Sequence, residues 1–453
     1  MDTKFLNVLM LGLGFMFLFT SFQTMGNIEQ TVLKSIAKDD PNFEGNGYTS
    51  LAIIYACLSL CNWLAPSALS ICGPRGAMFI GAITYCFFVA TFLIPKTWLL
   101  YVASAILGAG AALIWTGQGT YLSRCSNDSN ISRNSGIFWA MLQASMLIGN
   151  LFVFVQFQGK DHIDESTRSS VFIVLTAVAI VGVIFLGLLQ RVPHTYENTV
   201  DGDTDLDYKP RDHSAISAFQ NAIKLFFTRD MLLLSITFLY TGFELSFFSG
   251  VYGTSIGNTS KLGEMAKQLV GLSGICIGIG EIFGGVLFGL LGPKTIKYGR
   301  DPIVIIGFIV HLISFLMIYL NIPNGAPLDT TSETGFFEMP RAWLALLCSA
   351  LLGFGDACFN TQIYSMLGGA FANNSAAAFA VFKFTQSIAA AISFVYSSHM
   401  GLHSQMIILL MFGIMGTISF CMVEWSFKRS AKQLTSQTKD AADKLRNEIH
   451  PEA

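Results

Sequence analysis

The chain has 453 residues, of which 52% are hydrophobic and only 12% are charged. A soluble domain carries roughly 25% charged residues, so this composition excludes an ordinary soluble enzyme. The net charge of −2 offers no basic surface that would recruit nucleic acid. Composition therefore indicates an integral membrane protein.

Twelve apolar runs recur along the chain, each long enough to cross the membrane as a helix. Crossing about 30 Å of hydrocarbon takes roughly 20 helical residues. The runs lie near residues 5–28, 48–71, 76–94, 98–122, 135–157, 169–190, 231–255, 268–291, 302–322, 341–367, 375–397 and 403–426. The sequence therefore predicts an all-α, polytopic membrane protein with twelve transmembrane helices in two six-helix halves.

The spacing of these runs divides the chain into four segments. We expect an N-terminal half at 1–190, a cytosolic loop at 191–230, a C-terminal half at 231–427 and a cytosolic tail at 428–453. Apolar residues recur at helical spacing over 214–227, which favours an amphipathic helix on the inner membrane surface. An early start of the seventh span is the alternative for those residues.

Lysine and arginine are distributed unevenly between the two sides of this topology. With the N-terminus inside, 18 of the 27 fall in cytosolic segments and eight fall outside. The positive-inside rule therefore places both termini in the cytosol. The N-terminus leads directly into the first run and shows no small-residue cleavage site, so we expect this run to remain as a span. The expected location is the plasma membrane or an endolysosomal membrane.

The two halves repeat one another in sequence. Phe22-Gln23 in the first predicted span matches Phe243-Glu244 in the seventh. Glutamines also recur in corresponding spans, as Gln118 and Gln143 in the first half and Gln362 and Gln386 in the second. Each match is short, but all occur in the same order. A duplicated six-helix unit, which is typical of transporters, explains them.

Four ionisable side chains lie deep inside predicted spans of the second half: Glu244, Glu281, Asp356 and Lys383. Each costs about 2.5 kcal/mol or more at the centre of a membrane, so such residues are functional candidates. Asp356 and Lys383 are equally far from the turn near 368–374, which predicts an ion pair between neighbouring antiparallel helices. That pair is either a structural clamp or part of the function.

Glu244 and Glu281 are expected near the middle of the bilayer. Two carboxylates in a low dielectric cannot both ionise comfortably, so we expect at least one to hold a proton. Such a group could couple solute movement to a proton gradient; small watery crevices beside each acid are the alternative. The residues expected to contact a central cavity or an ion are Gln23, Asn27, Gln118, Glu244, Glu281, Asp356 and Asn360.

The sequence contains no positive motif for catalysis. Metalloprotease and phosphate-loop patterns do not occur, and the nine cysteines form no CxxC pair. We therefore expect no enzymatic activity, no cofactor and no metal. His311 is expected to be a packing residue, and Trp115 and Trp139 either pack between helices or line a cavity.

Four N-x-S/T sequons occur, at Asn127, Asn130, Asn258 and Asn373. The predicted topology places three of them in the cytosol, where glycosylation does not occur. Asn258 follows the seventh span on the outer side and is the predicted glycosylation site.

Two loops carry parts of the marker of the major facilitator superfamily. That marker has a glycine, an aspartate four residues on, and Gly-Arg seven and eight residues on. Gly292, Gly299 and Arg300 fit it, but Ile296 replaces the aspartate, and the first-half version keeps only Gly73-Pro-Arg75. The chain therefore resembles the superfamily while departing from the usual charge network of its gating loops.

A closer resemblance is to the Unc-93-like branch of that superfamily. The matching stretches include Phe22–Asn27, Gly47–Ser50, Arg133–Trp139, Glu244–Gly253, Gly278–Glu281, Phe359–Gln362 and Val423–Trp425. The resemblance implies the twelve-helix facilitator fold. It also implies a regulatory role as an alternative to transport, because family members include a potassium-channel accessory protein and an escort for endosomal receptors.

Two hypotheses for the function follow. The first is a solute carrier that works by alternating access, with a small solute or ion near the midplane and coupling to protons. The second is a non-transporting regulatory or trafficking subunit that binds a channel or receptor in the lipid bilayer. The charged residues of spans seven and ten favour the first hypothesis, and the eroded first-half marker favours the second.

Overall fold

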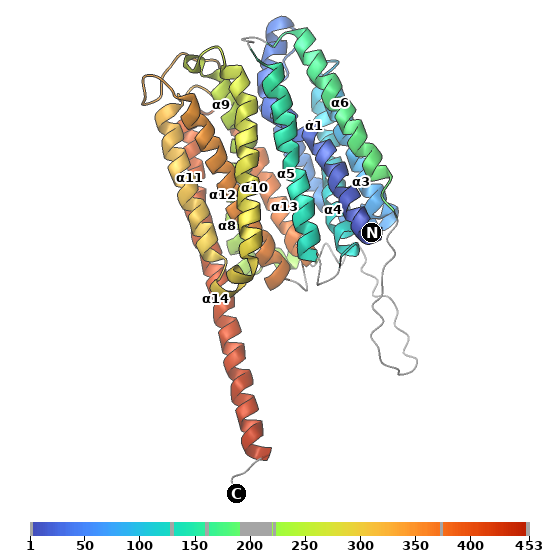
Figure 1. The fold of residues 1–453 in the computed structure, drawn as a ribbon, viewed down its shortest axis with the longest axis vertical. Helices are drawn as coiled ribbons and strands as arrows, with labels where there is room; N and C mark the ends of the chain where they lie inside the picture. Colours follow the sequence, from blue (N-terminus) through green and yellow to red (C-terminus); the bar gives the residue numbers. More distant parts are fainter. Residues whose placement is uncertain are drawn as a thin grey trace.

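The computed structural model describes residues 3–126, 131–158, 163–190, 220, 223–371 and 375–449 (Figure 1). The first half contains α1 (Thr3–Asp39), α2 (Gly47–Asn62), α3 (Ala65–Thr91), α4 (Thr97–Arg124), α5 (Ile131–Gln156) and α6 (Glu165–Gly187). The second half contains α8 (Arg229–Ser246), η1 (Phe247–Val251), α9 (Tyr252–Asn258), η2 (Ser260–Leu262), α10 (Ala266–Tyr298), α11 (Asp301–Asn321), α12 (Ala342–Ala370), α13 (Ser375–Ser397) and α14 (Leu402–Ile449).

In the part of the chain that the structure describes, eleven helices are long and apolar enough to cross a membrane. The second crossing is divided between α2 and the first residues of α3. The backbone of Gly73 has φ 70° and ψ 166°, so the direction of the chain changes inside α3, and Pro74 then opens the next helix. Twelve crossings result, which confirms the predicted fold class.

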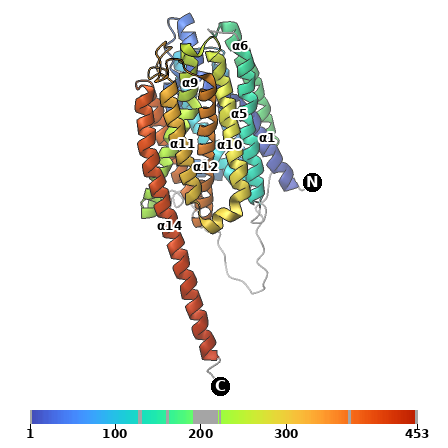
Figure 2. The ribbon, with the colours of Figure 1, turned by 60° about the vertical axis from the view of Figure 1, so that its left-hand side comes forward.

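We define the terminal face as the end of the bundle where α1 begins and where α14 leaves it, and the far face as the opposite end (Figure 1). Twelve alternating crossings place both chain ends on the terminal face. The last helix runs without a break from Leu402 to Ile449, so the predicted tail continues the final span and projects away from the bundle (Figure 2). Most of the predicted amphipathic helix at 214–227 lies outside the described residues, whereas residues 223–226 are helical.

Helices approach closely at glycines. A Cβ placed on Gly149 of α5 would lie 1.8 Å from Oγ1 of Thr24 on α1, and one on Gly280 of α10 would lie 2.0 Å from the Ala350 carbonyl on α12. Only glycine permits such approaches, which are the main source of packing energy between helices in lipid.

The two halves meet along two helix pairs. In one pair α2 packs against α13, and in the other α5 packs against α10. Inside the second half, α12 packs mainly on α10 and α11, while α13 packs on α2 and α8. Consecutive helices are therefore not always neighbours, and this decides which predicted site residues meet.

Candidate functional site

A fully buried hydrogen-bonded chain joins α8 and α11. The hydroxyl of Tyr240 lies 2.6 Å from Nδ1 of His311. The other ring nitrogen, Nε2, lies 3.2 Å from the Leu352 carbonyl and 3.2 Å from Oε1 of Glu244. A carbonyl only accepts, so Nε2 donates to Leu352, and in the neutral ring Tyr240 donates to Nδ1. His311, which we expected only to pack, therefore links a tyrosine to an acid.

Glu244 occupies an unusual position for a carboxyl group. Its side chain is fully buried, and neither carboxylate oxygen accepts a hydrogen bond, because the Nε2 proton of His311 is directed to Leu352. The carboxyl group of Asp356 interacts electrostatically with that of Glu244. One proton shared between these two acids would satisfy both, which makes the pair a suitable place to bind and release a proton.

Asp356 and Glu281 complete this group, which we call the acid cluster: Glu244, Glu281, Asp356 and His311. Asn360 lies one turn along α12 and donates from Nδ2 to Oδ1 of Asp356 at 2.6 Å. Glu281 on α10 is buried, and its Oε2 has no hydrogen-bond partner. Within the described ranges, no three such side chains converge closely enough to hold a metal ion. Carboxyl and imidazole groups are side chains that can bind and release protons.

Local sequence explains why these side chains converge. Gly355 precedes Asp356, and a Cβ there would lie 2.1 Å from Nε2 of His311. The absence of a side chain at this position gives the imidazole ring its space. Beyond Glu244, the helix continues into the π-helical turn η1, a feature that is frequent at functional sites.

The predicted ion pair between Asp356 and Lys383 is not formed in this structure. Among the described residues, no salt bridge joins them, and Nζ of Lys383 donates instead to Oε1 of Gln386 at 3.0 Å. The reason is helix placement, since α13 packs on α2 and α8 and hardly contacts α12. Gln386 in turn donates to Oγ1 of Thr241 at 3.3 Å, so Lys383 is connected to α8 and not directly to Asp356.

The candidates in the first half lie in a polar seam between α1 and α5. Ser145 donates to Oε1 of Gln23 at 2.5 Å, and Nδ2 of Asn27 donates to Oδ1 of Asn150 at 3.1 Å. Gln118 is buried on α4. The structure thus pairs two of the predicted cavity residues with partners that the sequence did not single out.

An aromatic layer crosses the boundary between the two halves, formed by Trp115, Trp139, Tyr364 and Phe382. The rings of Trp115 and Trp139 stack with centroids 6.0 Å apart. The centroid of Trp139 lies 5.5 Å from that of Tyr364 on α12, and Tyr364 lies 5.8 Å from Phe382 on α13. The two tryptophans therefore belong to a contact between the halves.

Glu29 is an ionisable residue that sequence reasoning missed. The first span was predicted to end at residue 28, but α1 continues to Asp39, so Glu29 is fully buried and neither carboxylate oxygen has a hydrogen-bond partner. The hydroxyl of Ser50 on α2 is a polar group near it. Buried acids are therefore present in both halves and not only in the second.

On the terminal face, the surviving part of the superfamily marker forms a charged network. Arg300 lies 3.1 Å from Glu424 on α14, and the adjacent Asp301 lies 2.6 Å from Lys428. Gly299 has φ 104°, and a Cβ there would lie 1.8 Å from Nζ of Lys428, so glycine is required. Glu424 is nearly completely buried and replaces the missing marker aspartate as the partner of the arginine.

On the far face, the halves are joined by polar contacts. Tyr48 donates from its hydroxyl to the Pro327 carbonyl at 3.2 Å, and Lys34 lies 3.6 Å from Asp329. Asn46 also lies 3.5 Å from the hydroxyl of Ser398 on the other half. These contacts connect α1 and α2 to the loops of the second half.

The predicted glycosylation site lies in a buried position. Asn258 is buried at the end of α9, where Nδ2 donates to the Ala326 carbonyl at 2.8 Å and Oδ1 accepts from Nζ of Lys267 at 3.3 Å. A glycan on Nδ2 would break the first of these bonds. The other three sequons, Asn127, Asn130 and Asn373, lie outside the described residues.

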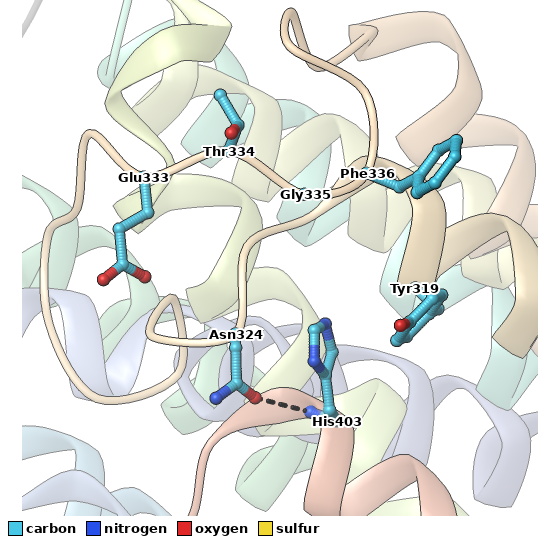
Figure 3. A pocket seen from close by; sticks show the side chains of 7 residues that line it. All are labelled: Tyr319, Asn324, Glu333, Thr334, Gly335, Phe336 and His403. Carbon is cyan, nitrogen blue, oxygen red and sulfur yellow. Dashed lines mark hydrogen bonds between the residues drawn. The ribbon is translucent and has the colours of Figure 1, made fainter.

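A cavity of about 500 Å³ opens on the far face (Figure 3). The backbone N–H of His403, at the start of α14, donates to Oδ1 of Asn324 at 2.9 Å, while Tyr319 and Phe336 stand to one side. The lining residues are Tyr319, Asn324, Glu333, Thr334, Gly335, Phe336 and His403. They come from α11, the loop before α12 and the start of α14, so this cavity contains none of the predicted site residues.

Comparison with solved structures identifies the class of fold. The nucleoside transporter NupG superposes with a TM-score of 0.60 at 15% identity, over 94% of this chain and 100% of that one. A POT family transporter in complex with 5-aminolevulinic acid gives a TM-score of 0.62 at 14% identity, over 93% and 96% of the two chains. At these identities the likeness establishes the fold alone, which this chain shares with these two transporters.

Comparison with sequences identifies the family. The family profile described as ion channel regulatory protein UNC-93 matches residues 42–421. UNC93-like protein MFSD11 of Xenopus laevis is 47% identical over 431 residues, which cover 93% of this chain and 96% of that protein. Protein unc-93 homolog A of Bos taurus is 26% identical over 98% of both chains. The chain belongs to the UNC-93 family, as its sequence stretches predicted.

Proposed function

We propose that the protein is a proton-coupled solute carrier that works by alternating access. The observation that carries this proposal is the acid cluster, in which Glu244 is fully buried without a hydrogen-bond donor and lies beside Asp356. A regulatory subunit gains nothing from such an arrangement, because unpaired buried carboxyl groups destabilise a membrane protein. A carrier gains a site whose charge changes when a proton enters or leaves.

The neighbouring side chains have defined parts in this proposal. Hydrogen bonds to Tyr240 and Leu352 hold the imidazole ring of His311 in place, so its Nε2 remains beside Oε1 of Glu244. Asn360 fixes the carboxyl group of Asp356 from the side of α12. When the acids lose their proton, the added negative charge disfavours the closed environment and favours a conformation that admits water.

The contacts between the halves supply the two gates of alternating access. The polar contacts of Tyr48, Lys34 and Asn46 hold the far face together. On the other side of the acid cluster, the aromatic layer joins Trp139 to Tyr364. Because these contacts connect different halves, a rocking motion of one half against the other breaks one set at a time.

The test is uptake by proteoliposomes that contain the purified protein. We expect a broad metabolite mixture to yield at least one solute whose uptake increases with an inward proton gradient. Glu244→Gln should abolish the dependence on the gradient, and Glu338→Gln, an exposed acid in the far-face loop, serves as the matched control. Uptake by Glu244→Gln with an unchanged response to the gradient would contradict proton coupling at this residue.

The family match favours one alternative function. The matching profile is described as an ion channel regulatory protein, so a non-transporting subunit that binds a channel or receptor is the second candidate. Cysteines introduced at Gln118 and Asn360 separate the two. A carrier predicts labelling from alternate sides that changes with solute, whereas a regulatory subunit predicts constant labelling and a stable complex that survives purification.

A further inference from the structure

The ammonium group of Lys383 is surrounded by groups that do not neutralise it. Its one hydrogen bond in the described structure goes to the neutral amide of Gln386. Nζ lies 4.7 Å from the ring centroid of Phe382 and 5.6 Å from that of Tyr364. Aromatic faces attract a cation, but they do not cancel its charge as a carboxylate does. Among the described residues, Lys383 is therefore a cation inside a membrane protein without an anion in contact.

This position lies where the two halves meet. Phe384, the next residue of α13, accepts a hydrogen bond at its carbonyl from Ser59 on α2 at 3.2 Å. Its ring also lies 5.0 Å from that of Trp63. Through Tyr364, the aromatic faces near Lys383 continue to Trp139 and Trp115 of the first half. The cation and a row of flat apolar surfaces thus share one boundary.

Buried amide groups without partners lie at the same boundary. Nδ2 of Asn62 on α2, one turn beyond Ser59, is buried with no hydrogen-bond partner. Oε1 of Gln143 on α5, one turn beyond Trp139, is also buried without one. A site for a solute needs donors and acceptors that the protein leaves unused, and these two groups provide one of each.

We propose that Lys383 and the aromatic layer form the subsite that binds the solute, and that the solute is an organic anion with a flat apolar body. The anionic group contacts the ammonium of Lys383, and the body lies against Tyr364 and Trp139. Asn62 and Gln143 are the polar contacts available to its edge. This inference rests on the proposed carrier function and names its substrate class.

The subsite also explains how a proton and an anion move together. The charged or titratable groups around Asp356 are Glu244 on α8, Glu281 on α10, His311 on α11 and Lys383 on α13. Among these, Lys383 is the one amine, and it acts electrostatically on Asp356 without contacting it. When the anion leaves, the charge of Lys383 stabilises an ionised Asp356 without a direct contact. When an anion returns to Lys383, Asp356 takes up a proton from water and becomes neutral.

The experiment measures binding to the full-length protein in detergent, without a proton gradient. Three probes share one ring and differ in charge: benzoate, benzamide and benzylamine. Trp115 and Trp139 belong to the aromatic layer, so tryptophan fluorescence reports occupancy. We expect saturable binding of benzoate, with benzamide and benzylamine weaker. Lys383→Gln should weaken benzoate binding by about thirtyfold or more, the effect of removing one partner of a buried charge pair.

Two variants control this measurement. Lys383→Arg keeps the charge and should retain benzoate binding, while Lys96→Gln removes an exposed lysine and should change nothing. Benzoate binding that survives in a folded Lys383→Gln, or a preference for benzylamine, would overturn the subsite. The absence of benzoate binding by the wild-type protein would overturn it as well.

The outcome is separable from that of the carrier proposal. Benzoate binding that depends on Lys383, with no solute uptake by proteoliposomes, would retain the subsite and reject transport. Uptake that follows the proton gradient, together with anion binding that is unchanged in Lys383→Gln, would retain the carrier and reject this subsite.

Discussion

The hydroxyl of Tyr240 lies 2.6 Å from Nδ1 of His311, and both side chains are fully buried between α8 and α11. This contact fixes which ring nitrogen faces Leu352 and Glu244. It therefore determines the arrangement of the acid cluster, and Tyr240 acts on the carboxyl group of Glu244 through the imidazole ring.

Replacement of Tyr240 by phenylalanine should destabilise the protein. The change leaves Nδ1 of His311 buried without a partner, which typically costs about 1–3 kcal/mol. Thermal unfolding of the purified variant in detergent measures the loss. Tyr319→Phe, at a half-exposed tyrosine of α11, is the control and should unfold at the wild-type temperature. Equal stability of Tyr240→Phe would show that the contact is dispensable.

Gly355→Ala should disturb the acid cluster without changing any charge. The new Cβ would lie 2.1 Å from Nε2 of His311, so the imidazole must move, at a cost of about 1–3 kcal/mol. Gly285→Ala on α10 is the matched control, because a Cβ there meets no atom within 4 Å. We expect lower thermal stability and altered proton-dependent uptake for the first variant alone. Identical behaviour of the two alanine variants would argue against a fixed imidazole.

Arg300→Met should destabilise the protein strongly. It leaves Glu424 buried without its arginine, and removing one partner of a buried pair costs about 3–5 kcal/mol. The double variant Arg300→Met, Glu424→Met should recover much of this loss. Lys34→Met is the comparison, since its partner Asp329 is 83% exposed and such pairs contribute about 0–1 kcal/mol. Equal losses of thermal stability in Arg300→Met and Lys34→Met would contradict this interpretation.

Glu29→Gln should be tolerated and should make stability less dependent on pH. The glutamine amide has the size of a protonated carboxyl group and cannot ionise. Glu29 is fully buried without a hydrogen-bond partner, so an ionised carboxylate there would be unfavourable. Stability of the wild-type protein relative to this variant should therefore decrease as the pH rises above about 4.3, where the same side chain ionises in the unfolded chain. Glu44→Gln, at an exposed acid near the start of α2, should leave the profile unchanged. Parallel profiles for wild-type and Glu29→Gln proteins would exclude this role.

The wild-type protein and Asn258→Gln should have the same mobility on a gel, both before and after removal of N-linked glycans. Asn258 is buried and bonded to Ala326 and Lys267, so the enzyme that attaches glycans has no exposed acceptor there. Gel mobility with and without glycosidase measures this. A glycosidase shift of the wild-type protein that disappears in the variant would show that the site is modified before the fold closes.

The order of the helices followed directly from hydropathy, because 20 apolar residues have few alternatives to crossing the membrane. The candidate site was predicted only in part. Spacing predicts a similar depth for Asp356 and Lys383, but depth does not state which helices are neighbours, and α12 packs on α10 and α11 instead of on α13. Asp356 therefore lies with Glu244 and Asn360.

Glu29 was missed for a different reason. It is followed by polar residues such as Gln30 and Lys34, so hydropathy suggested that the span had ended. In the folded protein, Oε1 of Gln30 accepts from the backbone N–H of Gly47 at 2.7 Å, which keeps this part of α1 inside the bundle. A polar residue that caps another helix cannot be distinguished from a loop residue by composition alone.

The uninterrupted course of α14 has a practical consequence for imaging. From Ser430, where its apolar span ends, the helix continues to Ile449, a rise of about 28 Å at 1.5 Å per residue. A folded domain fused to that end would be carried on a stiff rod in a defined direction. Such a fiducial would orient single particles of a membrane protein that otherwise has few features outside the detergent micelle.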